Sequence, residues 1–340
     1  MHLEGTVIAG PDFEPIEGRV VVEDGHIAAV EETTTDSTDI VLPAFVNAHT
    51  HVGDSVAKEG AVGLSLEAAV VPPDSRKHRH LREAPRAELV GAMRRTMGFM
   101  EATGTAAFLD FREFGREGAL ALREAAEGEP VEPSIFGSGD PSVLEVADGF
   151  GASGATDEDF RSRREATREA GKPFAIHAGE PDATDIHPAL DLDPDLLVHM
   201  VHAGPDHLER VATQEVSVAV CPRANQVLDV GRASLPDLLA HTTVALGTDN
   251  VMLNAPTMFR EMAYTSKTFD VSPREVLRMA TRAGAEIAGL DCGLVEAGRE
   301  AKLLVLDGDS DNLAGCVDPV AAVVRRAGTG DVKRTVLRSG

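Results

Sequence analysis

The sequence predicts an α/β protein: a (β/α)₈ barrel with a small β-sandwich domain formed from both chain ends. Three observations support this prediction. Eight short, mostly apolar runs lie between residues 40 and 248, helical periodicities fill most of the gaps between them, and β-type runs flank this region at both ends. Alternation of strands and helices that continues to eight repeats favours a closed barrel of parallel strands over other α/β folds.

The first predicted elements belong to the small domain. Residues 4–9 and 18–31 are β-type runs, and the second contains the hairpin signal Glu23-Asp24-Gly25. Residues 302–306 and 320–325 are similar runs near the other end. We therefore expect residues 1–39 and 293–340 to form the two parts of the small domain, and residues 40–292 to form the barrel.

Nearly continuous apolar runs are typical of parallel strands that are covered on both faces. The gap between the third and fourth runs is too short for a full helix, and a doubly wound open sheet is the alternative architecture. The predicted barrel strands are residues 40–47, 105–110, 132–137, 143–148, 173–178, 196–201, 216–221 and 243–248.

Helical spacing follows the first strand at Leu89, Met93, Met97 and Met100, and it follows the eighth at Val276, Ala280, Ala283 and Ile287. Residues 58–85 look instead like a long loop over the first strand. They contain two adjacent prolines and the charged run 76–80, whose histidines His78 and His80 we expect to be solvated. Loops of this length are usually functional lids or disordered.

The formal net charge of −24 is the most unusual bulk property, with 26 Arg but only 6 Lys among the basic residues. Such a surface repels nucleic acid and anionic lipid. Because the acidic residues are spread along the whole chain, we favour adaptation to high salt over an acidic surface for a partner. No apolar run is long enough to span a membrane and the N-terminus lacks a signal-peptide layout, so a cytoplasmic protein is expected. The three cysteines are far apart and suggest neither disulfides nor a Cys-rich metal site.

Histidines gather at the ends of predicted strands, where a (β/α)₈ barrel has its active site. His49 and His51 follow the first strand, and alternate residues of an extended segment point to the same side. Taken alone, this pair fits two solvated histidines at a strand end better than it fits a metal site. His177 in the fifth strand and Asp249 after the eighth complete a set of three imidazoles and one carboxylate, which suits zinc or iron.

Two further residues are candidates for catalytic roles. Glu180, three residues beyond His177, is expected to reach the cavity without binding the metal and to shuttle protons, unless it is an exposed loop residue. His199 is the better candidate of the pair His199 and His202 for contacting the water or the substrate. The sequence shows no Gly-rich phosphate loop, no GxSxG motif and no HxE…PCxxC signature.

With these residues placed, the sequence resembles the amidohydrolase superfamily, in particular its cytosine deaminase and chlorohydrolase-like branch. LPAFVNAHTH resembles the family's P-G-F-[VI]-[ND]-x-H-x-H with Ala44 in place of glycine, HAGE its H-x-x-E, and HMVHAG its H-C-V-H-L. CPRAN, LGTDN and AGREAKLLVLD match three further family motifs. The fourth-strand region EVADGFGASG lacks the lysine that bridges two metals in other branches. The resemblance therefore implies one divalent metal ion, zinc or Fe²⁺, on His49, His51, His177 and Asp249.

The reaction implied is hydrolysis by metal-activated water. Asp249 would accept a proton, His199 would steady the tetrahedral centre, and Glu180 would protonate the ring nitrogen and the leaving group. Deamination of an amino-purine or amino-pyrimidine-like ring is expected by resemblance. The alternatives are hydrolysis of a cyclic amide, C–N or C–Cl bond, and a catalytically silent ligand-binding barrel. The expected partner is a small-molecule substrate, and a homo-oligomer is compatible with the sequence. Arg112, Glu113, Arg223, Asn225, Asn250 and Asn254 are candidates for lining the pocket or are ordinary loop residues.

Overall fold

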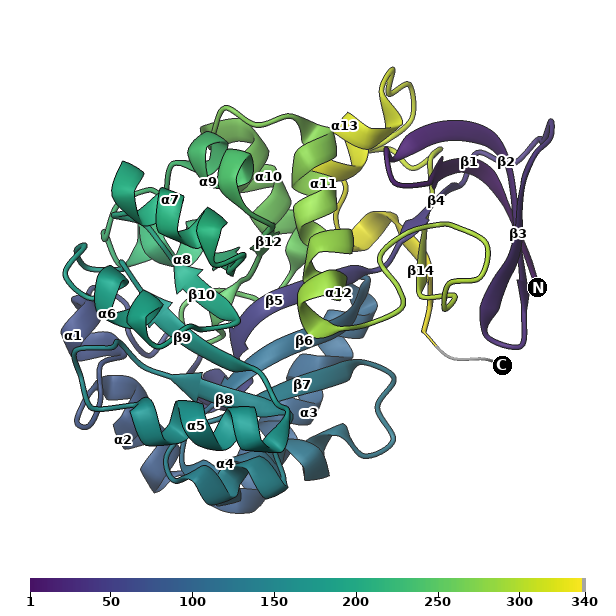
Figure 1. Cartoon of the computed structure of the whole chain (residues 1–340). Helices are drawn as coiled ribbons and strands as arrows, with labels where there is room; N and C mark the ends of the chain where they lie inside the picture. The colour runs from purple at the N-terminus through teal and green to yellow at the C-terminus, as the bar shows by residue number, and fades with distance from the viewer. Residues whose placement is uncertain (338–340) are drawn as a thin grey trace.

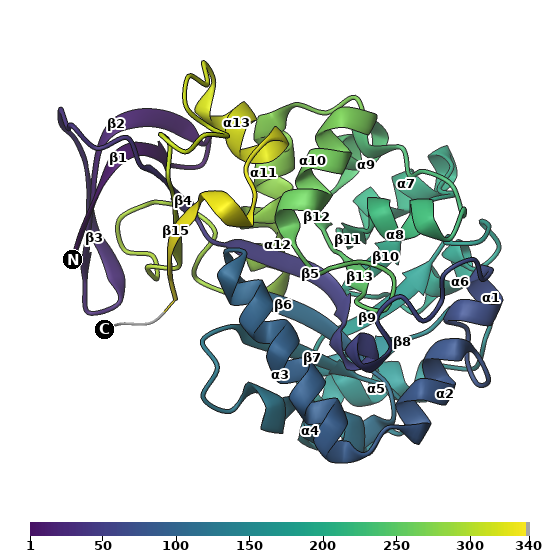
Figure 2. The same ribbon diagram turned by 180° about the vertical axis from the view of Figure 1, so that it is seen from behind.

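Two sheets organise the chain, and the computed structural model describes residues 1–337 of it (Figures 1 and 2). One sheet is parallel throughout and closes into a barrel. The strands that form it are β5 (Phe45–His51), β6 (Thr105–Arg112), β7 (Glu132–Gly137), β8 (Gly149–Ala152), β9 (Phe174–Ala178), β10 (Leu196–His199), β11 (Ser217–Val220), β12 (Val244–Leu246) and β13 (Asp249–Asn250).

The barrel closes between the last strand and the first. β12 pairs with β11, and β13, only two residues further along the chain, pairs in parallel with β5. These two segments therefore share the eighth strand position. Gly247 lies between them, and a Cβ added there would be 2.7 Å from the Cβ of His49. The closure thus needs glycine at this position, and it brings the start of β13 beside the histidines of β5.

The helices cover the outside of the barrel (Figure 1). In the order of the chain they are η1 (Val52–Ala57), α1 (Leu66–Ala69), α2 (Arg76–Glu83), α3 (Arg86–Ala102), α4 (Gly115–Ala126), η2 (Pro141–Glu145), α5 (Arg161–Ala170), α6 (Ile186–Asp191), α7 (Pro205–Thr213), α8 (Pro222–Val227), α9 (Leu235–His241), α10 (Met258–Thr268), α11 (Pro273–Ala280), α12 (Arg282–Ala288), α13 (Pro319–Arg325) and η3 (Thr329–Asp331). The predicted helical periodicities fall on α3, α11 and α12.

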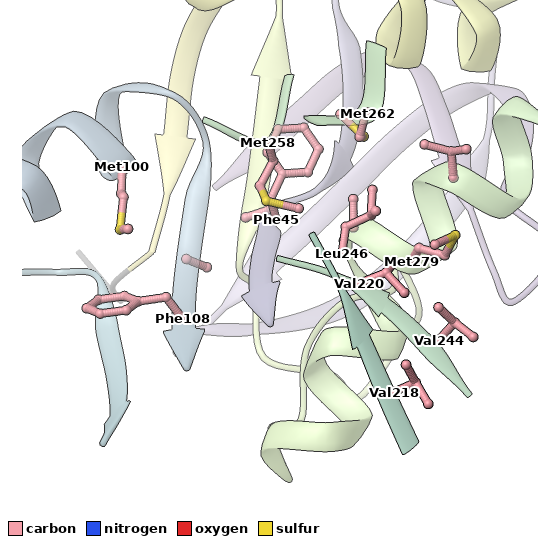
Figure 3. Packing of buried hydrophobic residues seen from close by; sticks show 14 of the residues in the cluster. Phe45, Met100, Phe108, Val218, Val220, Val244, Leu246, Met258, Met262 and Met279 are labelled. Carbon is pink, nitrogen blue, oxygen red and sulfur yellow. The ribbon is translucent and has the colours of Figure 1, made fainter. Parts of the chain in front are cut away.

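The core is divided by the alternation of side chains along the strands. Large side chains such as Phe108 and Leu246 pack with methionines of the surrounding helices, among them Met100 and Met258 (Figure 3). A second cluster on the opposite face of the strands is rich in alanine, including Ala175, and also contains larger side chains such as Leu109 and Phe111. Interior side chains of this kind fill a narrow barrel beneath its mouth.

The second sheet has six strands in the order β15-β14-β4-β1-β2-β3, and most of its pairs are antiparallel. β1 (His2–Ala9), β2 (Glu14–Glu23), β3 (His26–Glu32) and β4 (Ile40–Pro43) come from the beginning of the chain, while β14 (Leu303–Leu306) and β15 (Val332–Val336) come from its end. The fold is therefore a (β/α)₈ barrel with a small domain to which both ends contribute, as the sequence predicts.

The run 40–47 is divided between the two sheets. Its first four residues form β4, which pairs with β14, and the chain crosses at Ala44 into β5 of the barrel. Both halves are fully buried, so the apolar pattern gives no sign of the change of sheet.

The predicted fourth strand, residues 143–148, is wrong. This region contains the 3₁₀ helix η2, which begins at Pro141 after Asp140 caps the backbone N–H of Ser142 at 3.0 Å. The strand is β8, whose glycines Gly149 and Gly151 lie close to phenylalanine rings. A glycine-rich strand carries little hydrophobic pattern, and its later position explains the short gap after the third strand.

Two other predictions need correction. Residues 320–325 form α13 instead of a strand, because Asp318 caps the N–H of Ala321 and Pro319 occupies the first helical turn. The segment 58–85 is not a plain loop, since it contains α1 and α2. In the described part of the chain, no helix is long and apolar enough to cross a membrane.

Candidate active site

Six predicted site residues meet at the carboxyl ends of the barrel strands. His49 and His51 end β5, His177 lies in β9, His199 ends β10 and Asp249 starts β13, while Glu180 follows β9 by two residues. A cavity of about 460 Å³ opens there, and five of the six line it. The exception is His49, which is fully buried and does not line the cavity.

The proposed ligand atoms converge around Asp249. Its Oδ1 lies 3.4 Å from Nε2 of His49 and 3.6 Å from Nε2 of His51. One ligand atom from each of these three residues lies within 4.8 Å of the other two, and the same holds for His49, His177 and His199. The two groups share His49, so the four predicted ligands lie next to one another, with His199 as a member of the second group.

The chemistry of these donors fits a divalent cation. Neither ring nitrogen of His49 has a hydrogen-bond partner among residues 1–337, although both are buried. Burial lowers the pKa of His49, and it lowers the pKa of His51 to about 4, so both imidazoles are neutral at pH 7. Neutral imidazoles and an ionised carboxylate are the ligand forms that zinc binds.

Hydrogen bonds orient three of the groups. Nδ1 of His177 donates to the carbonyl oxygen of Ala152 at 2.9 Å, and Nδ2 of Asn250 donates to Oδ1 of Asp249 at 2.7 Å. Nδ1 of His199 donates to Oδ1 of Asn225 at 3.0 Å. The Nε2 atoms of both histidines therefore carry the free lone pair.

The backbone is strained at two of the site residues. His199 and Met200 have φ of 77° and 52°, and Asp249 has φ of 60°. Positive φ is uncommon outside glycine, and such residues cluster at functional sites. Here the conformation turns His199 towards the cavity, where its ring centroid lies 5.4 Å from that of His177.

Glu180 and Asp249 provide two carboxyl groups with different proton affinities. Oε2 of Glu180 lies 3.6 Å from Nε2 of His199. Burial, and next the charge of Asp249, raise the pKa of Glu180 to about 8. Burial acts in the same direction on Asp249, but the surrounding imidazoles of His49, His199 and His51 outweigh it and hold its pKa below the usual range. A protonated acid therefore lies close to an ionised carboxylate.

Sequence reasoning missed the role of the basic run in 76–80. Lys77 and His78 are buried and line the cavity, although His78 was expected to be solvated. The ammonium of Lys77 forms an ion pair with Glu113, which also contacts His51 and Arg112. Burial favours protonation of Glu113, but the charges of Lys77 and Arg112 hold its pKa well below the usual range. The sequence feature that could have indicated this role is the rarity of lysine, since the chain has only six and Lys77 is one of them.

The other pocket candidates separate into two groups. Arg112, Glu113 and Asn250 line the cavity. Arg223 instead binds the buried carboxylate of Glu261 through its backbone N–H at 2.9 Å and its Nε at 2.6 Å, which holds the start of α8. His202 is exposed and contacts the carbonyl oxygen of Val230, so His199 is the inward-facing member of the pair.

The comparisons with known proteins assign the chain to a family. The model of the amidohydrolase family matches residues 40–339. A relative from Methanothermobacter thermautotrophicus, named provisionally as an aminohydrolase, is 33% identical over 98% of this chain and 96% of its own. The 5-methylthioadenosine/S-adenosylhomocysteine deaminase of Halobacterium salinarum is 26% identical over 99% of this chain and 90% of its own.

A solved adenosine deaminase from Xanthomonas campestris with bound zinc has the same fold, with a TM-score of 0.77 and 19% identity over 99% of this chain and 91% of its own. This protein belongs to the amidohydrolase family. It is an enzyme of the class that hydrolyses carbon–nitrogen bonds other than peptide bonds.

Proposed function

We propose that this protein is a zinc-dependent deaminase that replaces the amino group of an amino-purine or amino-pyrimidine-like ring with a carbonyl oxygen and releases ammonia. The observation that carries the proposal is the pair of buried carboxyl groups, Glu180 and Asp249, next to His199. Two carboxyl groups with separated pKa values supply an acid and a base at the same pH.

His49, His51, His177 and Asp249 would hold the metal ion. A divalent cation at this position supplies Lewis-acid activation of water, lowering the pKa of that water towards about 7. Fe²⁺ would fit the same nitrogen and oxygen ligands. The relatives named as deaminases and the zinc in the solved adenosine deaminase support the proposal.

Asp249 acts as the base of the reaction. It is ionised, it lies among the imidazoles, and Asn250 fixes one of its oxygens by the 2.7 Å hydrogen bond. It takes a proton from the attacking water as the new C–O bond forms at the ring carbon.

Glu180 acts as the acid. It donates its proton to the ring nitrogen next to that carbon, so that the ring does not have to carry the electron pair as an anion. Glu180 then takes the hydroxyl proton of the tetrahedral centre and passes it to the amino group, which leaves as ammonia while the ring carbon becomes a carbonyl. The proton held by Asp249 returns to Glu180, so both carboxyl groups regain their starting state. Nε2 of His199, fixed by Asn225, faces Glu180, and once it is protonated it can donate a hydrogen bond to the oxygen of the tetrahedral centre.

The cavity is compatible with a planar ring. Phe111, Phe150 and Phe160 line one part of it, and Phe111 also packs edge-on against His49 and His177, with centroids 4.6 and 4.9 Å away. Apolar rings next to a few polar groups are typical of small-molecule sites.

The test is ammonia release by the zinc-loaded protein from adenine, guanine, cytosine, their nucleosides, 5-methylthioadenosine and S-adenosylhomocysteine. Glu180→Gln should lower turnover by about 10²–10⁴-fold while zinc content stays unchanged. Uniform inactivity of folded, zinc-loaded protein across this panel would refute the proposal. Unchanged turnover in the Glu180→Gln variant would remove Glu180 from the mechanism.

A further inference from the structure

We infer that Glu113 is a positioning residue for the metal ligand His51, and that Lys77 of α2 holds Glu113 in place. The helix α2 and the metal site would then form one coupled unit. This inference rests on the metal site of the proposed function, but it is independent of which substrate is turned over.

Glu113 contacts three cationic or potentially cationic groups with its two oxygens. Oε1 lies 2.8 Å from Nδ1 of His51 and also contacts the ammonium of Lys77, while Oε2 contacts the guanidinium of Arg112. The ring N–H of His51 does not point straight at Oε1, so the contact is close but bent. The side chains of Lys77 and Arg112 are 4% and 3% exposed, so water screens this cluster only weakly.

The position of Glu113 decides which nitrogen of His51 is available. Nε2 of His51 faces Oδ1 of Asp249, and Nδ1 faces Glu113 on the other side of the ring. A carboxylate beside Nδ1 stabilises the tautomer with its proton on that atom, which leaves the lone pair of Nε2 for a metal ion. Partners of this kind commonly set the orientation and basicity of metal-binding imidazoles.

The barrel itself fixes one side of Glu113. Arg112 lies against Gly53, where an added Cβ would be 2.1 Å from its guanidinium, and its Nη1 is 3.4 Å from Oδ1 of the buried Asp110. No side chain is tolerated at Gly53 while Arg112 keeps this place. Gly53 and Asp110 therefore hold the guanidinium of Arg112 where it contacts Glu113.

Lys77 reaches Glu113 from outside the barrel strands. It belongs to α2, a strongly charged helix in which Leu81 is the buried apolar residue. Burying an ammonium without a counter-ion is costly, so docking of this helix depends on the carboxylate that Lys77 meets. Within the described chain, Glu113 is the carboxylate recorded within ion-pair distance of Lys77.

The same segment forms a wall of the active-site cavity. Leu66, Val70, Val71 and Pro72 line the cavity together with Lys77 and His78. One carboxylate thus contacts both a metal ligand and the helix that closes one side of the substrate space. Metal binding at Nε2 of His51 should tighten the docking of α2 through Glu113, and loss of the Glu113 charge should weaken both.

The first experiment measures Zn²⁺ affinity of metal-stripped protein by competition with a chromophoric chelator. We expect Glu113→Gln to weaken zinc binding by about 10–100-fold, and Glu113→Asp, which keeps the charge, to recover part of that loss. The control is Glu117→Gln, which removes the same charge from an exposed residue of α4 that pairs with Arg86. Co²⁺ in place of zinc should give an altered absorption spectrum in Glu113→Gln and an unaltered one in the control.

The second experiment begins with the wild-type protein, so its first result does not depend on a variant that has to fold. Hydrogen–deuterium exchange of wild-type protein should slow in α2 when Zn²⁺ is added to the metal-stripped form, and it should slow less in α13. In Glu113→Gln the added protection of α2 should disappear, and in Lys77→Met α2 should exchange quickly with or without zinc.

Zinc affinity of Glu113→Gln equal to wild type, or no zinc-dependent protection of α2 in the wild-type protein, would overturn the inference. Absence of ammonia release with both zinc results as expected would overturn the proposed function alone. A wild-type protein that binds no zinc would overturn both.

Discussion

Removal of the Asn225 side chain tests whether the orientation of His199 matters for turnover. Asn225 is 2% exposed, and its Oδ1 accepts the hydrogen bond from the buried Nδ1 of His199. In Asn225→Ala this N–H loses its partner and finds no water, which costs about 1–3 kcal/mol of unfolding free energy. If the same amount is lost from the transition state, kcat/KM falls roughly 5- to 150-fold. Denaturant unfolding and steady-state ammonia release measure the two effects separately.

The matched control is Gln226→Ala, on the next residue of α8, which is exposed and accepts a hydrogen bond from Tyr264. It should change neither quantity by more than a small factor. Asn225→Asp keeps an acceptor opposite Nδ1 and should retain more turnover than Asn225→Ala. A variant Asn225→Ala that loses stability but keeps wild-type kcat would show that the hydrogen bond serves folding only, and the argument for His199 would fail.

Three further predictions follow from burial, close contact and charge. Gly247→Ala should destabilise the protein by about 1–3 kcal/mol and weaken zinc retention, because its Cβ would lie 2.7 Å from that of His49. The control in thermal denaturation is Gly328→Ala, whose Cβ would meet nothing within 4 Å. Equal melting temperatures of the two variants would contradict a barrel closure that needs glycine at position 247. In metal-free protein, Glu180 keeps its proton in the folded state between its usual pKa of 4.5 and its raised pKa of about 8, so its contribution to stability falls as pH rises through that window. The variant Glu180→Gln should therefore gain stability relative to wild type over the same window. Parallel profiles of stability against pH for the two proteins would refute the raised pKa of Glu180. With a net charge of −24, thermal stability should rise from 0.1 M to about 1 M KCl as the Debye length falls from about 10 to 3 Å; a flat or falling melting temperature would contradict the hypothesis of adaptation to high salt.

The elements that could be predicted from the sequence are those whose buried side chains produce a regular spacing of apolar residues. β6 and β9 carry nearly continuous apolar runs, and α3 shows one buried stripe, so their existence and type follow from periodicity. The strand β8 could not be predicted because its sequence is Gly-Phe-Gly-Ala. Its glycines let the backbone pack closely against Phe111 and Phe136, so the strand lacks a run of large apolar side chains. The helix α13 was not predicted because its apolar residues are equally typical of a strand. The helix-start signal, Asp318 followed by Pro319, was not used.

The proposed ligands could be found from short motifs because the carboxyl ends of all strands of a parallel barrel meet at one face. Residues that end different strands therefore lie close together although they are far apart in the sequence. His49, His177 and Asp249 could be chosen on that ground. Lys77 and Glu113 could not, since one lies on a helix of a charged segment and the other beyond a strand end, and only the docking of α2 brings them together.

The difference between these two sets has a physical origin that also bears on how the site works. Metal ligands are fixed by strand geometry, whereas the charge cluster depends on the position of α2, a polar helix whose one buried apolar residue is Leu81 and which therefore has few apolar contacts to hold it. The part of the site that sequence reasoning could not find is therefore the part most open to change with metal or substrate. A rigid set of ligands beside a wall that can open would let a ring enter the cavity without disturbing His49, His177 or Asp249.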